Sequence, residues 1–567
     1  MQNLEIASIF GNMADLLEIQ GANPFRVRAY RNGRSSLEAL TDTVEEIAKR
    51  GALKDIPGIG KDLAAKIVEY IDSGNIQAFE DMKKEVPIGL VEIVSVPTIG
   101  PKTAKAIFDH FGVTGIADLE KLVRSEELLS LPGVKKKTLE NVARGIALYK
   151  RRKGTFLLGR ALPIARDISK LLEPVAERVT HAGSLRRMKE SVHDIDILVA
   201  SDRPEEAMRT FLRMPSIART LVSGPTKTSV LIDGDLQVDL RVVDPRSWGA
   251  ALAYFTGSKN HNIRLRERAI KRGLKLNEYG LVDGNDRVVA ALEEEDIYRA
   301  LDLPWIPPVL REDLGEIEAA LEDRLPDLVQ PDDIRGDLHM HTTWSDGAQT
   351  TREMVEAAME RGYDYVAITD HSKSLGVAGG LSEADLARHI QEIRELDAGL
   401  PDFRVLSGTE VDIRNDGSLD YSDQMLGQLD FVVASIHSGF RQDRATLTER
   451  VVKAMRHPCV RVIGHPTGRL LGDRDPYELD MDVVMAEAAR TRTCLEVNAH
   501  YYRLDLGDVL CRKAREMGVQ VIISTDSHNF ENLRNLPYGV GTAQRGWLEK
   551  DHVLNTRPVD QLLDFKS

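Results

Sequence analysis

The sequence is poor in cysteine and contains no long apolar run. Its three cysteines, Cys459, Cys494 and Cys511, show no CxxC spacing, which predicts reduced core residues rather than a disulfide framework. No apolar stretch approaches the roughly 18 residues of a membrane helix. The start, MQNLEIASIF, lacks the basic region and apolar core of a signal peptide. We therefore expect a cytoplasmic protein.

The chain also lacks the overall basic charge that is typical of nucleic-acid-binding proteins. Its formal net charge is −14, but residues 1–300 carry a net +4 and the remainder −18. A near-neutral front half with basic clusters can follow phosphates, and an acidic back half suits multivalent cations. A chain of 567 residues should form several domains, and the acidic, proline-containing stretch 322–335 indicates a boundary between them.

Three segments of the front region repeat one pattern. Residues 55–70, 95–112 and 130–146 each contain a hydrophobic residue, a proline, a glycine-bearing turn, a lysine and an apolar helical period. Such a turn places free backbone N–H groups at the start of the second helix. A DNA phosphate can bind there whatever the base sequence of the DNA. An ordinary αα-hairpin is the alternative. The repeats resemble helix-hairpin-helix motifs, although Lys135 replaces the second glycine in the third copy. The expected DNA-binding residues are Gly58, Gly60, Lys61, Gly100, Lys102, Gly133 and Lys135.

Lys66 lies on the helix that the first hairpin begins. Together with NPFRVRAYRNG at 23–33, this region resembles the amino-terminal lyase domain of polymerase beta. The resemblance implies that Lys66 is a Schiff-base lysine with Tyr30 and Arg31 as companions. A lysine nucleophile requires a depressed pKa, and a solvated helix lysine is the alternative.

Three aspartates in the middle of the chain lie in two segments whose alternating polar and apolar residues predict strands. Asp194 and Asp196 lie two residues apart in DIDILV and project from one strand face, and Asp239 lies in the alternating segment LQVDLRVV. Neighbouring carboxylates repel one another unless cations neutralise them, which predicts Mg²⁺ or Mn²⁺ in two-metal phosphoryl transfer. The turn at Gly183 and Ser184 can donate to phosphates. A solvated acidic face is the alternative.

This pattern resembles the nucleotidyltransferases of DNA polymerase family X. The likeness continues through residues 253–280, which align with the polymerase beta thumb motif. His193 departs from the family at a position usually held by a small residue, and Gln237 stands where the vertebrate enzymes carry arginine. Both departures bear on pocket shape and activation of the primer hydroxyl. The resemblance implies that Asp194, Asp196 and Asp239 are catalytic metal ligands and that nucleotide is bound by Arg160, Gly183, Ser184, Arg187, Tyr254, Phe255, Gly257, Asn262 and Arg266.

Histidines and carboxylates gather in residues 336–567, nearly all where a short run of β-branched residues ends, as in VAITDH at 366–371. The carboxyl ends of parallel strands share one mouth, and imidazole with carboxylate suits Zn²⁺, Mn²⁺ or Fe²⁺. Scattered core or surface histidines are the alternative. The nine candidate ligands are His339, His341, Asp346, His371, Glu410, His437, His465, Asp526 and His528.

These nine residues match the pattern of the PHP domain, the polymerase and histidinol phosphatase family. The resemblance implies up to three ions at the mouth of the barrel. The first would be held by His339, His341, Glu410 and Asp526; the second by Glu410, His437 and His465; the third by Asp346, His371 and His528. Clustered cations support hydroxide attack on a phosphate. Arg503 is expected either to contact substrate phosphate or to form a surface ion pair, and Glu496 and Asn498 to support the ligands.

The resemblances cover essentially the whole chain and imply a multidomain protein. The expected parts are an all-α helix-hairpin-helix N-terminal region, an α+β nucleotidyltransferase palm and thumb, and a C-terminal distorted (β/α)7 PHP barrel. Their expected bounds are 1–85 for a lyase-like helical domain, 86–150 for a helix-hairpin-helix subdomain, 151–245 for the palm, 246–315 for the thumb, 316–335 for a linker and 336–567 for the PHP domain.

This organisation predicts template-directed filling of short gaps and Mn²⁺-dependent 3′-5′ exonuclease or DNA end-processing activity in repair. The partners would be gapped or nicked DNA and deoxynucleoside triphosphates, with the protein acting as a monomer. One alternative is a phosphoesterase of histidinol-phosphatase type with a degenerate polymerase half. Another is a non-catalytic scaffold for DNA ends.

Overall fold

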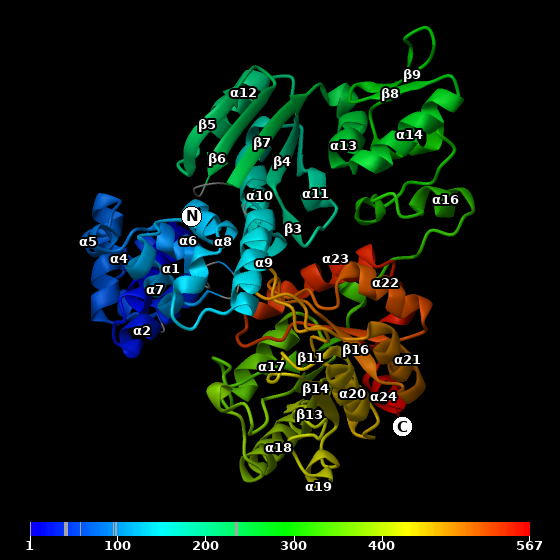
Figure 1. Ribbon diagram of the computed structural model, residues 1–567. Helices are drawn as coiled ribbons and strands as arrows, with labels where there is room; N and C mark the ends of the chain where they lie inside the picture. Colours follow the sequence, from blue (N-terminus) through cyan, green and yellow to red (C-terminus); the bar gives the residue numbers. More distant parts are fainter. Residues whose placement is uncertain are drawn as a thin grey trace. The chain divides into compact units, whose positions relative to one another are not determined.

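A computed structural model describes residues 2–38, 44–56, 58–94, 96, 99–152, 154–232 and 236–566. The chain forms two compact units, Met1–Gly154 and Thr155–Ser567, and Figure 1 labels many of their elements. Among the described helices, none has the length and apolar character needed to cross a membrane.

The described residues of the first unit form helices joined by turns and loops, with no strand among them, as predicted. One core surrounds Phe10, Tyr30 and Ile67, and a second surrounds Ile107 and Leu119. Each core is built from the apolar faces of amphipathic helices, which bury side chains at helical spacing. The helices are α1 (Gln2–Ile19), α2 (Pro24–Glu38), α3 (Val44–Lys49), α4 (Lys61–Ser73), α5 (Gln77–Glu85), α6 (Gly89–Val94), α7 (Pro101–Phe111), α8 (Ile116–Arg124) and α9 (Lys136–Arg152).

The second unit begins with a five-stranded sheet of order β2-β4-β7-β6-β5. Its strands are β2 (Arg178–His181), β4 (Asp194–Ala200), β5 (Ile217–Ser223), β6 (Lys227–Ile232) and β7 (Leu236–Val243). Along β4, Ile195 and Ile197 pack in one core with helices α10 (Leu158–Leu172) and α12 (Pro204–Leu212). Leu198 packs in a different cluster with Trp248 of α13 (Trp248–Thr256). Because side chains alternate along a strand, Asp194 and Asp196 share the face of Leu198.

The thumb region follows, with a buried ionic network at its centre. Glu294 is 3% exposed and accepts hydrogen bonds from Arg186, from Arg311 at 2.6 Å and from Trp305 Nε1 at 2.8 Å. Arg311 is fully buried. Because Arg186 belongs to the palm turn and Glu294 to the thumb, their hydrogen bond connects these two regions. The elements here are α13, α14 (Lys259–Lys271), β8 (Lys275–Asn277), β9 (Gly280–Val282), β10 (Val288–Ala290), α15 (Glu294–Ala300) and α16 (Glu316–Leu321).

The remainder of the unit is a parallel seven-stranded sheet in sequential order. A bridge between Met340 and Ser527 brings its last strand back to its first, so the sheet nearly closes into the predicted barrel. The strands are β11 (Gly336–Met340), β12 (Tyr365–Ile368), β13 (Arg404–Asp412), β14 (Phe431–Ser435), β15 (Val460–Ile463), β16 (Cys494–Asn498) and β17 (Val521–Ser524). The helices that surround them include α17 (Thr351–Glu360), α18 (Glu383–Ala398), α20 (Arg444–Met455), α21 (Met481–Thr491), α22 (Asp508–Glu516) and α23 (Leu536–Arg545).

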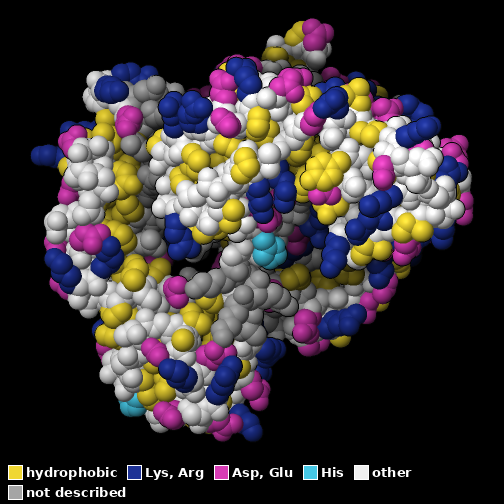
Figure 2. All heavy atoms as spheres, turned by 90° about the horizontal axis from the view of Figure 1, so that it is seen from above, with side chains coloured by type: hydrophobic (Ala, Val, Ile, Leu, Met, Phe, Trp, Pro, Cys, Tyr) yellow, Lys and Arg dark blue, Asp and Glu magenta, His cyan; other side chains and the backbone are white. Residues whose placement is uncertain are grey.

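Palm, thumb and barrel pack against one another within this second unit. Leu504 and Tyr538 of the barrel region belong to the palm core, and Trp547 belongs to the thumb core. The segment 316–335, expected to be a linker, contains α16 and the fully buried Val329. On the face shown in Figure 2, basic, acidic and hydrophobic side chains are interspersed.

Candidate active sites

The three palm aspartates lie side by side on two neighbouring strands. Asp196 of β4 stands directly opposite Asp239 of β7 in the parallel register, and Asp194 stands opposite Gln237. Burial, followed by repulsion from Asp194 and Asp239, raises the pKa of Asp196 to about 7. Crowded carboxylates of this kind fit a divalent cation, which would relieve the repulsion that raises the pKa.

Neighbouring residues restrict the positions of two of these carboxylates, Asp239 and Asp196. Gln237 Nε2 donates to Asp239 Oδ1 at 2.8 Å, and Lys227 Nζ lies 3.5 Å from Asp239 Oδ2. A Cβ atom at Gly183 would lie 2.1 Å from Asp196 Oδ2, and Gly183 has a φ of +60°. Only glycine therefore allows the turn to approach Asp196 so closely. Gln237, which stands where the vertebrate enzymes carry arginine, thus binds Asp239 through its side-chain amide.

The expected nucleotide-binding residues fall into two groups. Gly183, Ser184 and Arg187 lie on the turn of α11 (Gly183–Arg186), and the Arg187 guanidinium reaches the end of α13 by donating to the Thr256 carbonyl at 2.6 Å. Gly257 follows with a φ of +68° and a ψ of −152°. Arg187 is also bound to Glu312, a contact that the sequence did not predict.

The remaining nucleotide candidates lie on helices around this turn. Tyr254 and Phe255 form an edge-to-face pair with ring centroids 5.1 Å apart. Asn262 Nδ2 donates to the Tyr254 carbonyl at 2.7 Å. Arg160 on α10 and Arg266 on α14 are exposed. The structure thus connects Asn262 to the Tyr254 backbone and leaves the two outer arginines on the surface.

All nine histidines and carboxylates expected in the barrel lie at its mouth, with Glu410 of β13 at the centre. His371 Nδ1 lies 2.8 Å from Glu410 Oε2, and His465 Nε2 lies 3.0 Å from Glu410 Oε1. His437 Nε2 approaches Oε1 to 3.3 Å. His339 and His341 lie within 3.7 Å of Oε2. One buried carboxylate therefore meets five imidazoles from four strand ends, because His339 and His341 both belong to the end of β11.

Two further carboxylates, Asp526 and Asp346, lie at the mouth of the barrel. Asp526 Oδ1 lies 3.2 Å from His341 Nε2 and 3.7 Å from His339 Nε2. Asp346 Oδ1 lies 3.4 Å from His528 Nε2 and 3.6 Å from His371 Nε2. Asp346 therefore joins imidazoles from two strand ends, those of β12 and β17, whereas both of these imidazoles beside Asp526 come from the end of β11.

These residues form three groups with metal-ligand spacing. The groups are His341, Asp346, His371 and His528; His339, His341 and Asp526; and His371, Glu410 and His437. This grouping differs from the expected division among three ions, because His341 and His371 each belong to two groups and His465 to none. The division among ions stays a prediction.

The chemistry of the donors fits divalent cations. His339 Nε2 and His341 Nδ1 are buried without a hydrogen-bond partner among the described residues. Burial, helped by the neighbouring His528 and His371, lowers the pKa of His341 to about 4, which favours the neutral ligand form. Burial opposes the charge of His437, yet Glu410 and Asp412 raise its pKa to about 10. A cation bound at this imidazole would take the place of that proton.

Carboxylates behind the cluster orient its imidazoles. Glu496 Oε1 is 2.7 Å from His339 Nδ1, and Glu496 Oε2 accepts from the His465 backbone N–H at 2.5 Å. Asn498 Nδ2 donates to Asp526 Oδ2 at 3.1 Å. Asp412 Oδ1 is 2.7 Å from His437 Nδ1, a role that the sequence analysis missed. The signal was present, because Asp412 follows Glu410 by two residues on one strand and so shares its face.

Arg503 lies beside the cluster. Its Nε is 3.5 Å from Asp526 Oδ2, and its Nη1 is buried with no hydrogen-bond partner among the described residues. The guanidinium therefore has a donor left at the edge of the barrel mouth.

In the first unit, the expected DNA-binding glycines lie at helix starts and turns. Gly60 and Gly100 are the N-cap residues of α4 and α7, and Gly58 and Gly133 have φ values of +76° and +87°. Lys61 begins α4, Lys102 lies in the first turn of α7 and Lys135 immediately precedes α9. Pro57 and Pro97, which belong to the repeated pattern, lie outside the described residues.

Lys66 has an acidic partner in this unit. Its Nζ lies 2.7 Å from Asp62 Oδ1, and its side chain is 13% exposed. Tyr30 is buried in the core that contains Ile67, the residue that follows Lys66 on α4. The surroundings of Lys66 are therefore an ion pair at the edge of a packed core.

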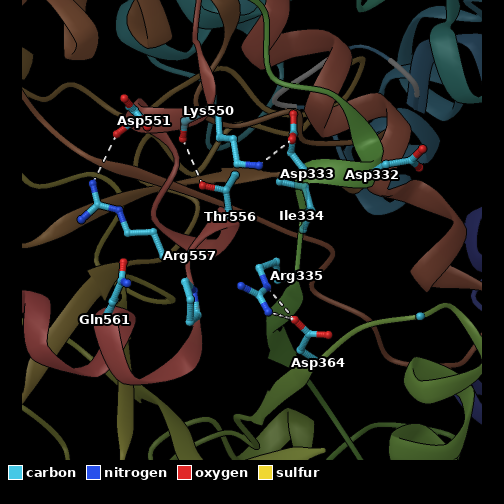
Figure 3. A pocket seen from close by; sticks show the side chains of 12 residues that line it. Asp332, Asp333, Ile334, Arg335, Asp364, Lys550, Asp551, Thr556, Arg557 and Gln561 are labelled. Carbon is cyan, nitrogen blue, oxygen red and sulfur yellow. Dashed lines mark hydrogen bonds and ion pairs between the residues drawn. The ribbon is translucent and has the colours of Figure 1, made fainter.

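A pocket of about 540 Å³ opens elsewhere on the barrel (Figure 3). Four of its charged side chains form two ion pairs: Lys550 Nζ lies 2.9 Å from Asp333 Oδ1, and Arg335 pairs with Asp364. The metal-ligand candidates do not line it. It is therefore distinct from the histidine and carboxylate cluster at the barrel mouth.

Comparisons with known proteins agree with this geometry. Family models match as a Helix-hairpin-helix domain over residues 1–76, a SAM-like Helix-hairpin-helix tandem over 90–147, a DNA polymerase beta thumb over 251–312 and a PHP domain over 337–500. The DNA polymerase/3'-5' exonuclease PolX of Bacillus subtilis (strain 168) is 38% identical over 570 residues, covering 100% of this chain and 99% of the relative. A probable phosphatase of Shewanella sp. (strain MR-4) is 28% identical over 239 residues, covering 40% of this chain and 90% of its own. A probable phosphatase of Acetivibrio thermocellus is 29% identical over 201 residues, covering 34% of this chain and 78% of its own.

Proposed function

Because this chain belongs to the family of the DNA polymerase/3'-5' exonuclease PolX, we propose that it fills short gaps in DNA and trims 3′ ends. The predicted resemblance to DNA polymerase family X is confirmed by the match over the full chain and by the thumb and PHP models. The observation that carries the proposal is the presence of two separate carboxylate centres. One is the Asp196–Asp239 pair of the palm, and the other is the Glu410 cluster of the barrel.

In the palm, the proposed reaction is attack of a primer 3′-hydroxyl on the α-phosphate of a deoxynucleoside triphosphate. A P–O bond to the primer forms, the bond to the β-phosphate breaks and pyrophosphate leaves. Asp194, Asp196 and Asp239 would hold divalent cations, which supply neutralisation of phosphate charge and a lowered pKa of the attacking hydroxyl. The turn at Gly183 and Ser184, with Arg187, would hold triphosphate oxygens.

The Tyr254–Phe255 pair would pack against the incoming sugar, and the glycine at 257 would let the backbone approach it. Asn262 and Arg266 would lie toward the base pair. Arg160 would add charge near the triphosphate. The roles within residues 251–312 rest on the match to the polymerase beta thumb and on the contacts of Arg187 and Asn262, whereas the role of Arg160 rests on the resemblance to family X alone.

In the barrel, the proposed reaction is hydrolysis of the terminal 3′ phosphodiester, which releases a nucleoside monophosphate. The nine mouth residues would hold Mn²⁺, Zn²⁺ or Fe²⁺, which supply a hydroxide at neutral pH. Glu496 and Asp412 would keep His339 and His437 oriented. Arg503, with its free Nη1, would bind a phosphate oxygen.

The helical unit would hold the DNA backbone on either side of the gap. The N-termini of α4 and α7, with Lys61 and Lys102, suit phosphate binding without sequence preference. Lys66 would add lyase chemistry only if it were released from Asp62 as a neutral amine. The proposed setting is DNA repair in the cytoplasm, by a monomer acting on gapped DNA.

One labelled gapped duplex tests both activities. With Mn²⁺ and nucleotides, the native chain should extend the primer, and without nucleotides it should shorten it. Asp196→Asn should lose extension by about a thousandfold or more while trimming continues. His339→Ala should show the reverse. Extension by Asp196→Asn, or undiminished trimming by His339→Ala, would reject the corresponding assignment.

A further inference from the structure

The guanidinium of Arg187 is held by two acceptors. Its Nε donates to Glu312 Oε1 at 3.0 Å, and its Nη1 donates to the Thr256 carbonyl at 2.6 Å. The side chain is 11% exposed. Among the described contacts, its Nη2 has no acceptor within the protein. The orientation of this arginine is therefore set by groups that are remote from it in the sequence.

Glu312 is the central acceptor of this arrangement, and the barrel supplies its second arginine. Arg545 Nη1, at the end of α23, donates to Glu312 Oε1 at 3.0 Å and to the Arg187 carbonyl at 2.9 Å. Burial disfavours the charge on Glu312, but Arg187 and Arg545 hold its pKa below the ordinary value. The carboxylate is therefore ionised and bridges two guanidinium groups.

Arg545 is itself fixed from within the barrel. Its Nε and Nη2 both donate to Asp508 Oδ2, at 2.9 and 2.7 Å, and its side chain is 7% exposed. Asp508 is the first residue of α22. A continuous chain of charge-assisted hydrogen bonds thus runs from the phosphoesterase barrel to Arg187.

We propose that Arg545 and Glu312 are positioning residues for the polymerase reaction, through which the PHP barrel fixes Arg187 with its Nη2 edge available to the triphosphate. The inference rests on the proposed role of Arg187 in nucleotide binding. An unrestrained arginine would lose side-chain conformational entropy each time a nucleotide bound. Because Glu312 already holds Arg187, part of this entropy cost is removed from nucleotide binding. Binding of nucleotide is therefore the step that the contact improves.

Two substitutions test the proposal in the full-length enzyme. Arg545→Met and Glu312→Gln should each raise KM for the correct nucleotide about five- to tenfold in gap filling, with kcat within about twofold. Arg545→Lys keeps a charge but not the fork of donors, so it should recover only part of the loss. The nuclease rate should stay within about twofold of the native value, which shows that the variants fold.

Arg512→Met is the matched control. Arg512 crosses the same interface, since its Nη1 donates to the Leu314 carbonyl at 2.9 Å, but its recorded contacts include neither Arg187 nor Glu312. Loss of this bond should leave KM for nucleotide unchanged. A rise equal to that of Arg545→Met would mean that the interface as a whole, and not the chain to Arg187, controls nucleotide binding, and the proposal would be overturned.

A double-mutant cycle separates this inference from the function on which it rests. In an Arg187→Ala background, Arg545→Met should raise KM no further, because its effect passes through Arg187. An additive rise, or no effect of Arg545→Met in the native background, overturns the inference alone. If Arg187→Ala itself leaves KM unchanged, the proposed triphosphate role of Arg187 fails and the inference fails with it.

Discussion

At the scale of single residues, Glu496 shows how a buried carboxylate prepares a metal-binding imidazole. It is fully buried and binds His339 Nδ1 at 2.7 Å and Ser524 Oγ at 2.6 Å. Glu496→Gln should lower the affinity of the barrel for Mn²⁺ about 10- to 100-fold, because the amide no longer fixes the tautomer and ring orientation of His339. A Mn²⁺ titration of nuclease activity measures the change, and direct calorimetric titration checks it without a substrate. Unchanged Mn²⁺ affinity would show that His339 is oriented by other groups.

Glu294 carries a pH-dependent share of stability. Burial disfavours its ionised form, but Arg311 and Arg186 outweigh that effect and hold its pKa below the ordinary value. A lowered folded pKa contributes stability above the unfolded pKa of about 4.3 and loses it as pH falls toward the folded pKa. Glu294→Gln should therefore destabilise the thumb by about 3–5 kcal/mol near pH 7, and its deficit should shrink below about pH 5. Thermal unfolding across this pH range measures both effects.

The neighbouring Glu293 provides the control for this prediction. Its side chain is 40% exposed and pairs with Arg178, which is 43% exposed. An exposed pair contributes about 0–1 kcal/mol, so Glu293→Gln should change the unfolding temperature little. A deficit for Glu294→Gln that stayed constant down to pH 3 would contradict the linkage argued for the buried carboxylate.

The residue types at the two centres could be predicted from the sequence, whereas several contacts could not. The positions of Asp194, Asp196 and Glu410 on their strands are predictable, because strand alternation and strand ends place such side chains at regular positions. Glu312 and Arg545 carry no such signal, since each is an ordinary charged residue whose contact with Arg187 spans more than a hundred positions. Their role depends on how the barrel packs on the thumb, which local pattern does not encode. Asp412 is an intermediate case. Strand alternation predicts that it shares a face with Glu410, but no local pattern predicts its contact with His437.

At the scale of elements, α4 and α7 allow a test of backbone binding by the helical unit. Lys61 begins α4 directly after the N-cap Gly60, and Lys102 lies in the first turn of α7, two residues after the N-cap Gly100. If each lysine neutralises one phosphate, Lys61→Ala and Lys102→Ala should each reduce the slope of log K against log salt by about 0.9. The loss should be the same for DNA of any sequence. Fluorescence anisotropy with labelled gapped DNA at several salt concentrations gives these slopes.

Lys84 is the control for the helix starts. It lies in the last turn of α5, is 71% exposed and pairs with Asp81. Lys84→Ala should leave the salt slope unchanged. Equal losses from Lys84 and from the two hairpin lysines would indicate diffuse attraction rather than phosphate sites at the helix N-termini.

At the scale of the whole molecule, the palm and the barrel share a core. Leu504 comes from the barrel region, is fully buried and belongs to the palm cluster with residues such as Leu158 and Val192. Arg469 supports the same segment by donating to the Leu504 carbonyl, and its Nη2 lies 2.7 Å from Glu190 of the palm. Palm and barrel should therefore lose structure together, although they carry different reactions.

Leu504→Ala tests this shared stability. Removing a fully buried leucine costs about 2–5 kcal/mol, so the calorimetric transition of the second unit should fall by on the order of 5 °C. Gap filling and 3′ trimming should both inactivate at the lower temperature, because the lost packing belongs to both regions. Val509→Ala, which truncates a nearby side chain that is 72% exposed, should leave both inactivation temperatures in place. If Leu504→Ala lowered the inactivation temperature of only one activity, palm and barrel would be separate folding units that merely touch.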